Sequence, residues 1–491
     1  MSQHKRGIAR TQTALLPPTL DDYAGAQSIV RVIDAYVSAL DMAGLGFKNA
    51  VAGPMGASSY GPEDLLRLYL YGYWHRIRAS RQLAVECKRN VEVMWLMRQL
   101  TPCFKTIAEF RSRHAGPFQA VCAQFVQFLR EIELVGGKVP VVAVDGSKFK
   151  ASASRASLVD AKQAAKQREK IRARIAQYLA QMDEADRQDE GEGELSAQSI
   201  EAALKRLRER DQQLERAQAE LAAREDGDKS KDATPRVGLT DPDCVMLTGK
   251  GSTLAGYNVQ QAVDTQHKLI VAHEVTTRGN DHTSLEPMAS QAQEVLRAGA
   301  MTAVADTGYM NGEQAQACED RGITPVVPMA QPSNTRAAEC YPKSMFIYDP
   351  ASDTYRCPAG ETLTRYKHDQ SAETDYYSTS ACARCAMRSQ CTASKKGRSI
   401  ARSWFAGAAE RAHERARGNR HLMRLRSATA EHPFGNLKTM LAGGFLLRTL
   451  PKVKGEMALA VLTYNLKRTL NILGIDQLME KLRTKTAFMG V

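Results

Sequence analysis

VPVVAVDGSKFKAS, residues 139–152, is an apolar run rich in β-branched residues that turns polar at Asp145. A short apolar run of this composition is typical of a buried β-strand. We therefore expect a strand here that brings the Asp145 carboxylate to the edge of a sheet.

The elements expected after this strand follow a definite order. Strands are predicted at residues 257–264, 269–276 and 323–327, a helix at about 284–297, a strand in MTAVADTGY (301–309) that carries Asp306, and a helix through Glu319. This order is that of an α/β, ribonuclease-H-like mixed sheet, in which the first and fourth strands lie side by side. Asp145 and Asp306 would then share one site. Glu431, in AEHPFGNLK, is the candidate third acid, on a helix packed over the sheet.

The rest of the chain divides around this core. Residues 1–138 are predicted to be helical, either a DNA-binding domain or an ordinary helical bundle, with Ser80 as a helix cap and Thr106 with Glu109 as a capping box. No other strand is expected before residue 257. We assign the catalytic core to 139–156, 237–330 and 400–475, a coiled-coil hairpin to 157–236, a cysteine-containing insertion to 331–399, and a C-terminal tail to 476–491.

The hairpin prediction rests on heptad spacing of apolar residues on both sides of an acidic, glycine-containing loop at residues 189–194. The spaced residues are Ile171, Ile175, Tyr178, Met182 and Ala185 before the loop and Ile200, Leu204, Leu207, Leu214 and Leu221 after it. Most hairpins of this kind are scaffolds or oligomer contacts, so we expect no active-site residues here.

Positive charge is concentrated late in the chain. The sequence has 67 Lys and Arg against 54 Asp and Glu, a net charge of +13, and ten of the basic residues lie between Lys395 and Arg426 beside two acids, Glu410 and Glu414. Such an excess favours a polyanionic partner, although a solvated basic face is the plainer alternative. No apolar run approaches the roughly 18 residues of a membrane span. With no secretory signal, we expect a cytoplasmic, nucleoid-associated protein without a membrane partner.

Four of the ten cysteines are grouped: Cys357, Cys382, Cys385 and Cys391. They lie in a turn-rich segment that lacks an apolar core of its own, and their spacing favours a tetrahedral structural Zn²⁺ site. Free thiols and a redox pair remain alternatives. Cys340 is a possible substitute ligand, and Cys87, Cys103 and Cys122 are expected to be core residues.

The chain resembles the DDE transposases of bacterial insertion sequences, in the branch with an N-terminal helical region and a cysteine cluster. The resemblance is carried by LYLYGYWHRIRASRQLAVECKRNVEVMWL (68–96), VVAVDGSKFKA (141–151), LIVAHEVTTRGNDHTSL (269–285), ADTGY (305–309) and EHPFGNLK (431–438). It implies that Asp145, Asp306 and Glu431 are catalytic carboxylates that hold two divalent metal ions, Mg²⁺ or Mn²⁺. Two such ions activate the attacking hydroxyl and stabilise the leaving oxygen in phosphoryl transfer. The partner would be double-stranded DNA, bound by a homodimer.

Near the third acid, the pattern common in the family is Tyr, two residues, Arg, three residues, Glu, six residues, Lys. Glu431 and Lys438 keep this spacing, whereas Arg424 and Ser427 occupy the Tyr and Arg positions and Arg426 is one residue out of place. The residues expected to contact DNA are Lys148, Lys150, Arg426 and Lys438. Two rival functions stay open: a nuclease with the same core that does not join strands, and an inactive or repurposed transposase that only binds DNA.

Overall fold

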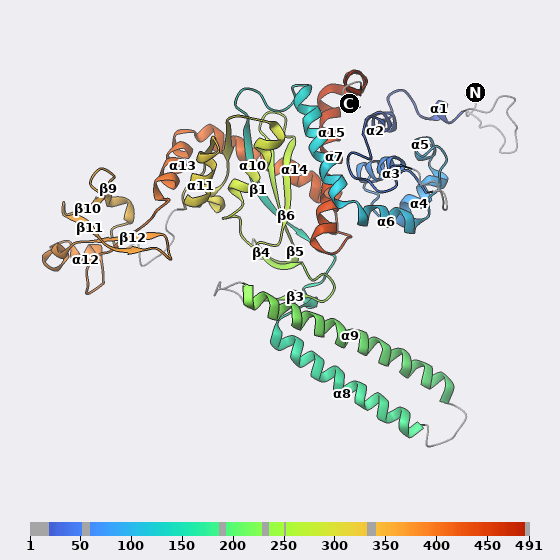
Figure 1. Cartoon of the computed structure of the whole chain (residues 1–491), viewed down its shortest axis with the longest axis horizontal. Coiled ribbons are helices and arrows are strands. Elements are labelled where there is room, and N and C mark those ends of the chain that lie inside the picture. The colour runs from blue at the N-terminus through green and yellow to red at the C-terminus, as the bar shows by residue number, and fades with distance from the viewer. Residues whose placement is uncertain are drawn as a thin grey trace, which may run out of the picture.

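The computed structural model describes residues 19–51, 59–185, 193–227, 235–249, 252–330 and 340–486. Its centre is a six-stranded mixed sheet (Figure 1). The strands are β1 (Val141–Lys150), β4 (Val245–Gly249), β5 (Ser252–Asp264), β6 (Ile270–Thr276), β7 (Met301–Val304) and β8 (Ile323–Val326). Their order is β4-β5-β1-β7-β8, with β6 also paired to β5. The chain is therefore a mixed α/β protein, as the sequence predicts.

The register of the sheet places the strands of the two aspartates side by side. β1 runs parallel to β7, with Val141 opposite Thr302, and antiparallel to β5, with Asp145 opposite Gln261. β7 is parallel to β8. Two details differ from expectation: β5 begins at Ser252, and β4 precedes it. The expectation of no strand before residue 257 was therefore wrong, because the stretch TGKGST (248–253) interrupts the short apolar segments on either side of it.

Helices cover both faces of the sheet. They are α10 (Leu285–Leu296), α11 (Gly312–Asp320), α13 (Ala406–Gly418), α14 (Arg420–Met440) and α15 (Leu450–Thr486). Phe149, on the same face of β1 as Asp145, contacts Phe434, so α14 covers this face. Pro433 lies inside α14 and is buried. Proline lacks the backbone N–H that an interior helix position normally donates, and here the burial of its ring in the core offsets that loss.

The N-terminal region is helical and packs against α15. Its helices are α1 (Leu20–Tyr23), α2 (Ile29–Ser38), α3 (Pro62–Trp74), α4 (Ser80–Arg89), α5 (Val91–Leu96), α6 (Phe104–Arg113) and α7 (Ala115–Glu131). One continuous apolar core joins these helices to the sheet. Two predicted caps were wrong: Ser80 is already the first residue of α4, and Thr106 lies inside α6, which begins after Cys103.

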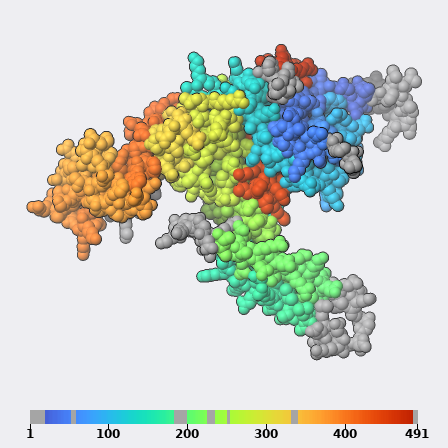
Figure 2. All heavy atoms as spheres, in the orientation of Figure 1, coloured from blue at the N-terminus to red at the C-terminus, as the bar shows by residue number. Residues whose placement is uncertain are grey.

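The described residues between 157 and 236 form a helical hairpin that stands away from the body as an arm (Figures 1 and 2). α8 (Ala161–Ala185) and α9 (Gly193–Gly227) pack along each other, and β2 (Leu158–Val159) pairs with β3 (Val237–Gly238) at the base. Leu214 and Leu221 are buried in a small core of its own. The side chains of Met182 and Ala185 and residues 189–192 of the predicted loop lie outside the described part.

A second, five-stranded sheet occupies the cysteine-containing region. Its order is β13 (Ile400–Ser403), β12 (Thr374–Ser378), β11 (Thr362–Asp369), β10 (Thr354–Arg356) and β9 (Ile347–Asp349), with the short helix α12 (Arg388–Cys391) beside it. Phe346, Tyr355, Leu363, Tyr377 and Ile400 form its core. The expectation that this segment lacks an apolar core was wrong, because four of the five core residues are spread singly among polar strands.

The C-terminal residues also differ from the expected tail. α15 continues to Thr486, with a break in helical geometry at Gly474, whose φ is 76°. Leu478 and Leu482 beyond the break are buried in the main core. Within the described residues, no helix is long and apolar enough to cross a membrane.

Candidate functional site

Asp145 and Asp306 lie at the same edge of the central sheet. Asp145 is within β1, and Asp306 follows the end of β7 as the cap of a short 3₁₀ turn, Thr307–Tyr309. Each carboxylate uses one oxygen locally: Asp145 Oδ1 accepts from the Gly146 amide and Asp306 Oδ1 from the Gly308 amide, both at 2.8 Å. The Oδ2 atom of each aspartate is left for another partner.

That partner is the guanidinium of Arg426, on α14. Its Nη1 lies 3.4 Å from Asp145 Oδ2 and 3.9 Å from Asp306 Oδ2. The Arg426 side chain is 15% exposed, whereas those of Asp145 and Asp306 are 21% and 46% exposed. Within the described structure, Arg426 Nε and Nη1 are buried without a hydrogen-bond partner. The guanidinium is therefore held between two carboxylates by charge and not by directed hydrogen bonds.

The charges around Asp145 leave its carboxylate incompletely neutralised. The pKa of Asp145 is raised to about 6: burial is the largest cause, Arg426 and the Gly146 amide lower the pKa, and the nearby Asp306 and Asp281 carboxylates add smaller increases. A pKa raised by burial and like charge means that the anionic form lacks enough positive compensation. A divalent cation would supply this compensation.

A further set of polar residues, which the sequence did not predict, lies next to Asp145. Asp281 Oδ1 accepts from Asn258 Nδ2 at 2.8 Å and from Gln260 Nε2 at 2.6 Å. The Tyr309 hydroxyl donates to Gln260 Oε1. A chain of hydrogen bonds thus links the turn after Asp306 to Asp281. The one sequence signal was the position of Asp281 between the third strand and the next helix.

Glu431 is not brought into contact with the two aspartates. It is exposed on α14, where the Ser427 hydroxyl donates to its Oε1 at 3.0 Å. It is the fifth residue after Arg426, which places it about 140° around and about 7.5 Å along the helix. Among the described residues, no group of three or more His, Cys, Asp or Glu side chains is arranged to hold a metal ion as it stands.

The predicted DNA contacts lie on different surfaces. Lys148 and Lys150 alternate with Phe149 and so lie on the face of β1 opposite to Asp145. Lys148 Nζ donates to the Thr248 carbonyl oxygen, and Lys150 is exposed. Lys438 Nζ lies 5.9 Å from the centre of the Phe149 ring. Only Lys438 and Arg426 therefore share the Asp145 face of the sheet.

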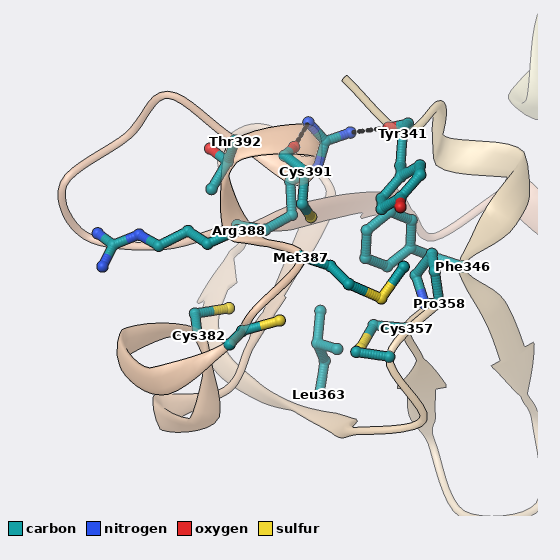
Figure 3. A pocket seen from close by; sticks show the side chains of 13 residues that line it. Tyr341, Phe346, Cys357, Pro358, Leu363, Cys382, Met387, Arg388, Cys391 and Thr392 are labelled. Carbon is teal, nitrogen blue, oxygen red and sulfur yellow. Dashed lines mark hydrogen bonds between the residues drawn. The ribbon is translucent and has the colours of Figure 1, made fainter. Parts of the chain in front are cut away.

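The four grouped cysteines line one cavity in the small sheet domain. Cys357, Cys382, Cys385 and Cys391 meet there with apolar neighbours that include Phe346 and Leu363. Figure 3 shows Cys357, Cys382 and Cys391 around this hollow. Burial raises the pKa of Cys391, and the three other thiols raise it further, while Arg398 lowers it. Cys340 is not among the lining residues.

The remaining cysteine predictions divide. Cys87 and Cys122 are buried, as expected for core residues. Cys103 is exposed, so its assignment to the core was wrong. It precedes α6, where its thiol contacts the Thr106 hydroxyl at 3.3 Å, and a helix start at the surface leaves it open to solvent.

Comparison with known proteins adds two family matches. Residues 356–470 match the model described as Transposase DDE domain, and residues 18–113 match Transposase domain (DUF772). The first match spans the cysteine cluster, Arg426 and Glu431, and Asp145 and Asp306 lie outside it. No curated protein matches the chain. A solved structure, the piggyBac transposase synaptic complex with hairpin DNA, is 9% identical at a TM-score of 0.29, over 95% of this chain and 80% of that chain. A likeness this weak carries no argument.

Proposed function

Because the chain belongs to the DDE transposases of insertion sequences, we propose that it cleaves DNA at the ends of a mobile element and joins the freed ends to target DNA. The observation that carries this proposal is the pairing of Asp145 and Asp306. They lie at one edge of adjacent parallel strands, and each has one carboxylate oxygen directed at a shared cation. The strand order β6-β5-β1-β7-β8 supports a ribonuclease-H-like core.

The residues present fit a divalent metal. Carboxylate oxygens are the ligands that Mg²⁺ prefers, and a cationic side chain already stands between the two aspartates. Bound Mg²⁺ or Mn²⁺ would polarise the phosphoryl oxygens and lower the pKa of the attacking hydroxyl. Asp145 and Asp306 would hold the metal. Glu431 is proposed as the third acid and would have to approach from α14. Lys438, on the same helix, would contact a phosphate of the bound DNA.

The test is cleavage of duplex DNA that carries the element's own flanking ends, with Mg²⁺. Wild-type protein should cut at the ends, and Asp145→Ala and Asp306→Ala should each lose about 100-fold or more, because a metal ligand contributes several kcal/mol to the transition state. Asp320→Ala removes an exposed aspartate on α11 and should cut normally. Equal cutting by wild type and Asp145→Ala would refute the proposed site.

Two rival outcomes remain distinguishable in the same experiment. End-specific cutting without joined products would identify a nuclease that does not transfer strands. DNA binding without cutting would identify a non-enzymatic binder, which the exposed position of Glu431 and the altered residues before it favour. A homodimer on paired DNA ends belongs to the main proposal and would appear as a complex of two chains with two end duplexes.

We also propose a structural Zn²⁺ ion for the small sheet domain. The support is the chemistry of the lining: four cysteines from three separate segments line one apolar cavity, and thiolates are preferred Zn²⁺ ligands. Their thiols would have to draw together around the ion, because among the described residues no three of them are already placed to hold a metal. The ion would tie the turn after β10 to the segment before β13. Its role would be to stabilise this domain, because the five-residue core alone is small.

A further inference from the structure

Arg426 combines two properties that rarely occur together. Its side chain is only 15% exposed, yet Nε and Nη1 lack hydrogen-bond partners in the described structure. A buried guanidinium normally satisfies its donors, because an unpaired buried polar group loses its hydrogen bonds to water without replacing them. The Nη1 atom faces Asp145 Oδ2 and Asp306 Oδ2 at 3.4 and 3.9 Å, longer than charge-assisted hydrogen bonds.

The two aspartates explain why a cation stands there. Each has committed Oδ1 to a backbone amide, and each directs Oδ2 at the same guanidinium. Without a positive charge between them, two partly buried carboxylates repel one another. The place between the two Oδ2 atoms is therefore a cation site, and the chain fills it with its own side chain.

We propose that Arg426 is a positioning residue that occupies the metal site of the metal-free protein and is displaced when a divalent ion binds. This inference rests on the proposed function, because it concerns the same two aspartates. The incomplete hydrogen bonding of the guanidinium keeps the cost of displacement low. Once displaced, it lies on the Asp145 face of the sheet, next to the expected path of DNA, and can pair with a phosphate.

Occupation by Arg426 has a measurable consequence for metal affinity. A guanidinium and a metal ion compete for the same two oxygens. The apparent affinity for metal is therefore the intrinsic affinity multiplied by the fraction of time that the site is free. If Arg426 occupies the site about nine-tenths of the time, its removal should tighten metal binding about tenfold. An ordinary structural salt bridge predicts no such gain, because loss of a supporting residue weakens metal binding.

The experiment is a titration of the metal-free full chain with Mn²⁺ in the absence of DNA. Electron paramagnetic resonance measures the concentration of free Mn²⁺ at each step. Arg426→Gln and Arg426→Ala should bind Mn²⁺ about tenfold more tightly than wild type. Arg426→Lys, which keeps the charge, should remain close to wild type. Arg424→Ala removes the same charge from an exposed position two residues away and should leave the affinity unchanged. Thermal unfolding of each variant verifies that it is folded.

The outcomes separate this inference from the proposed function. If wild type binds Mn²⁺, Asp145→Asn abolishes binding and Arg426→Gln fails to tighten it, the displacement idea is overturned and the metal site stands. If neither wild type nor Arg426→Gln binds Mn²⁺, both proposals fail. Tight binding by Arg426→Gln alone, with weak binding by wild type, would support displacement most directly.

Discussion

Gly146 follows Asp145 in β1 and lies under the carboxylate of Asp281. A Cβ atom at this position would lie 2.5 Å from Gln260 Nε2 and 2.9 Å from Asp281 Oδ1, two atoms that are hydrogen-bonded to each other. Gln260 is fully buried and also accepts from Tyr309, so it has little room to move. We expect Gly146→Ala to break this hydrogen-bond chain.

The predicted cost of Gly146→Ala is about 1–3 kcal/mol of unfolding free energy, the range for overpacking a filled site. End cleavage should fall with it, because a displaced Gln260 loses its hydrogen bond to Tyr309, in the turn that follows Asp306. Urea unfolding and the cleavage assay measure the two effects. Gly435→Ala on α14, where a Cβ would meet nothing within 4 Å, is the matched control. Equal stability of the two variants would contradict the packing argument.

At this scale the sequence indicated part of the site. Asp145 was identifiable because an apolar β-branched run ends at it, and Asp306 because a second such run precedes it. Asn258, Gln260 and Asp281 were not, because their hydrogen bonds join residues 21 and 23 positions apart through tertiary packing. The position of Glu431 on its helix was also unpredictable, since a proline two residues later usually ends a helix and here does not.

Among the elements, the small sheet domain gives the clearest prediction. We expect purified protein to carry about one Zn²⁺ per chain, and Cys382→Ser and Cys385→Ser to lose it, because a structural site needs its full set of four ligands. Chelation should lower the stability of the domain, since zinc binding supplies folding free energy. Metal analysis by mass spectrometry and limited proteolysis measure the two effects.

Cys103→Ser is the control for this experiment, because Cys103 is exposed and lies just before α6, far along the chain from the cysteine cluster. It should retain zinc and resist proteolysis like wild type. A metal-free protein with a disulfide between Cys382 and Cys385 would instead establish the redox alternative.

The central strands and helices were predictable from periodicity, since β1, β6, β7 and β8 are apolar runs buried in the sheet. The five strands of the small sheet were not. β11, for example, has the sequence TLTRYKHD and is largely exposed, so it shows almost no apolar pattern. Its strand structure depends on pairing with β10 and β12, which is a tertiary property.

In the whole molecule, the N-terminal helices and the central sheet share one core, and Arg78 joins them. Arg78, between α3 and α4, donates to the Gly444 and Ala442 carbonyl oxygens at 2.9 and 2.7 Å and pairs with Glu456 at 3.2 Å. Glu456, in α15, is fully buried and accepts from the Leu446 and Leu447 amides. This cluster fixes the turn that follows α14, the helix of Arg426 and Glu431.

Arg78→Ala should therefore destabilise the protein by about 3–5 kcal/mol, because it leaves the Glu456 carboxylate buried without its counter-charge. Arg78→Lys should recover only part of this, since an ammonium group cannot reach both carbonyl oxygens and the carboxylate as a guanidinium does. Lys88→Ala, at an exposed position on α4, is the control and should change stability by less than about 0.5 kcal/mol. Urea unfolding measures all three variants. A loss below about 1 kcal/mol for Arg78→Ala would mean that the shared apolar core, and not this ion pair, holds the N-terminal helices against the central sheet.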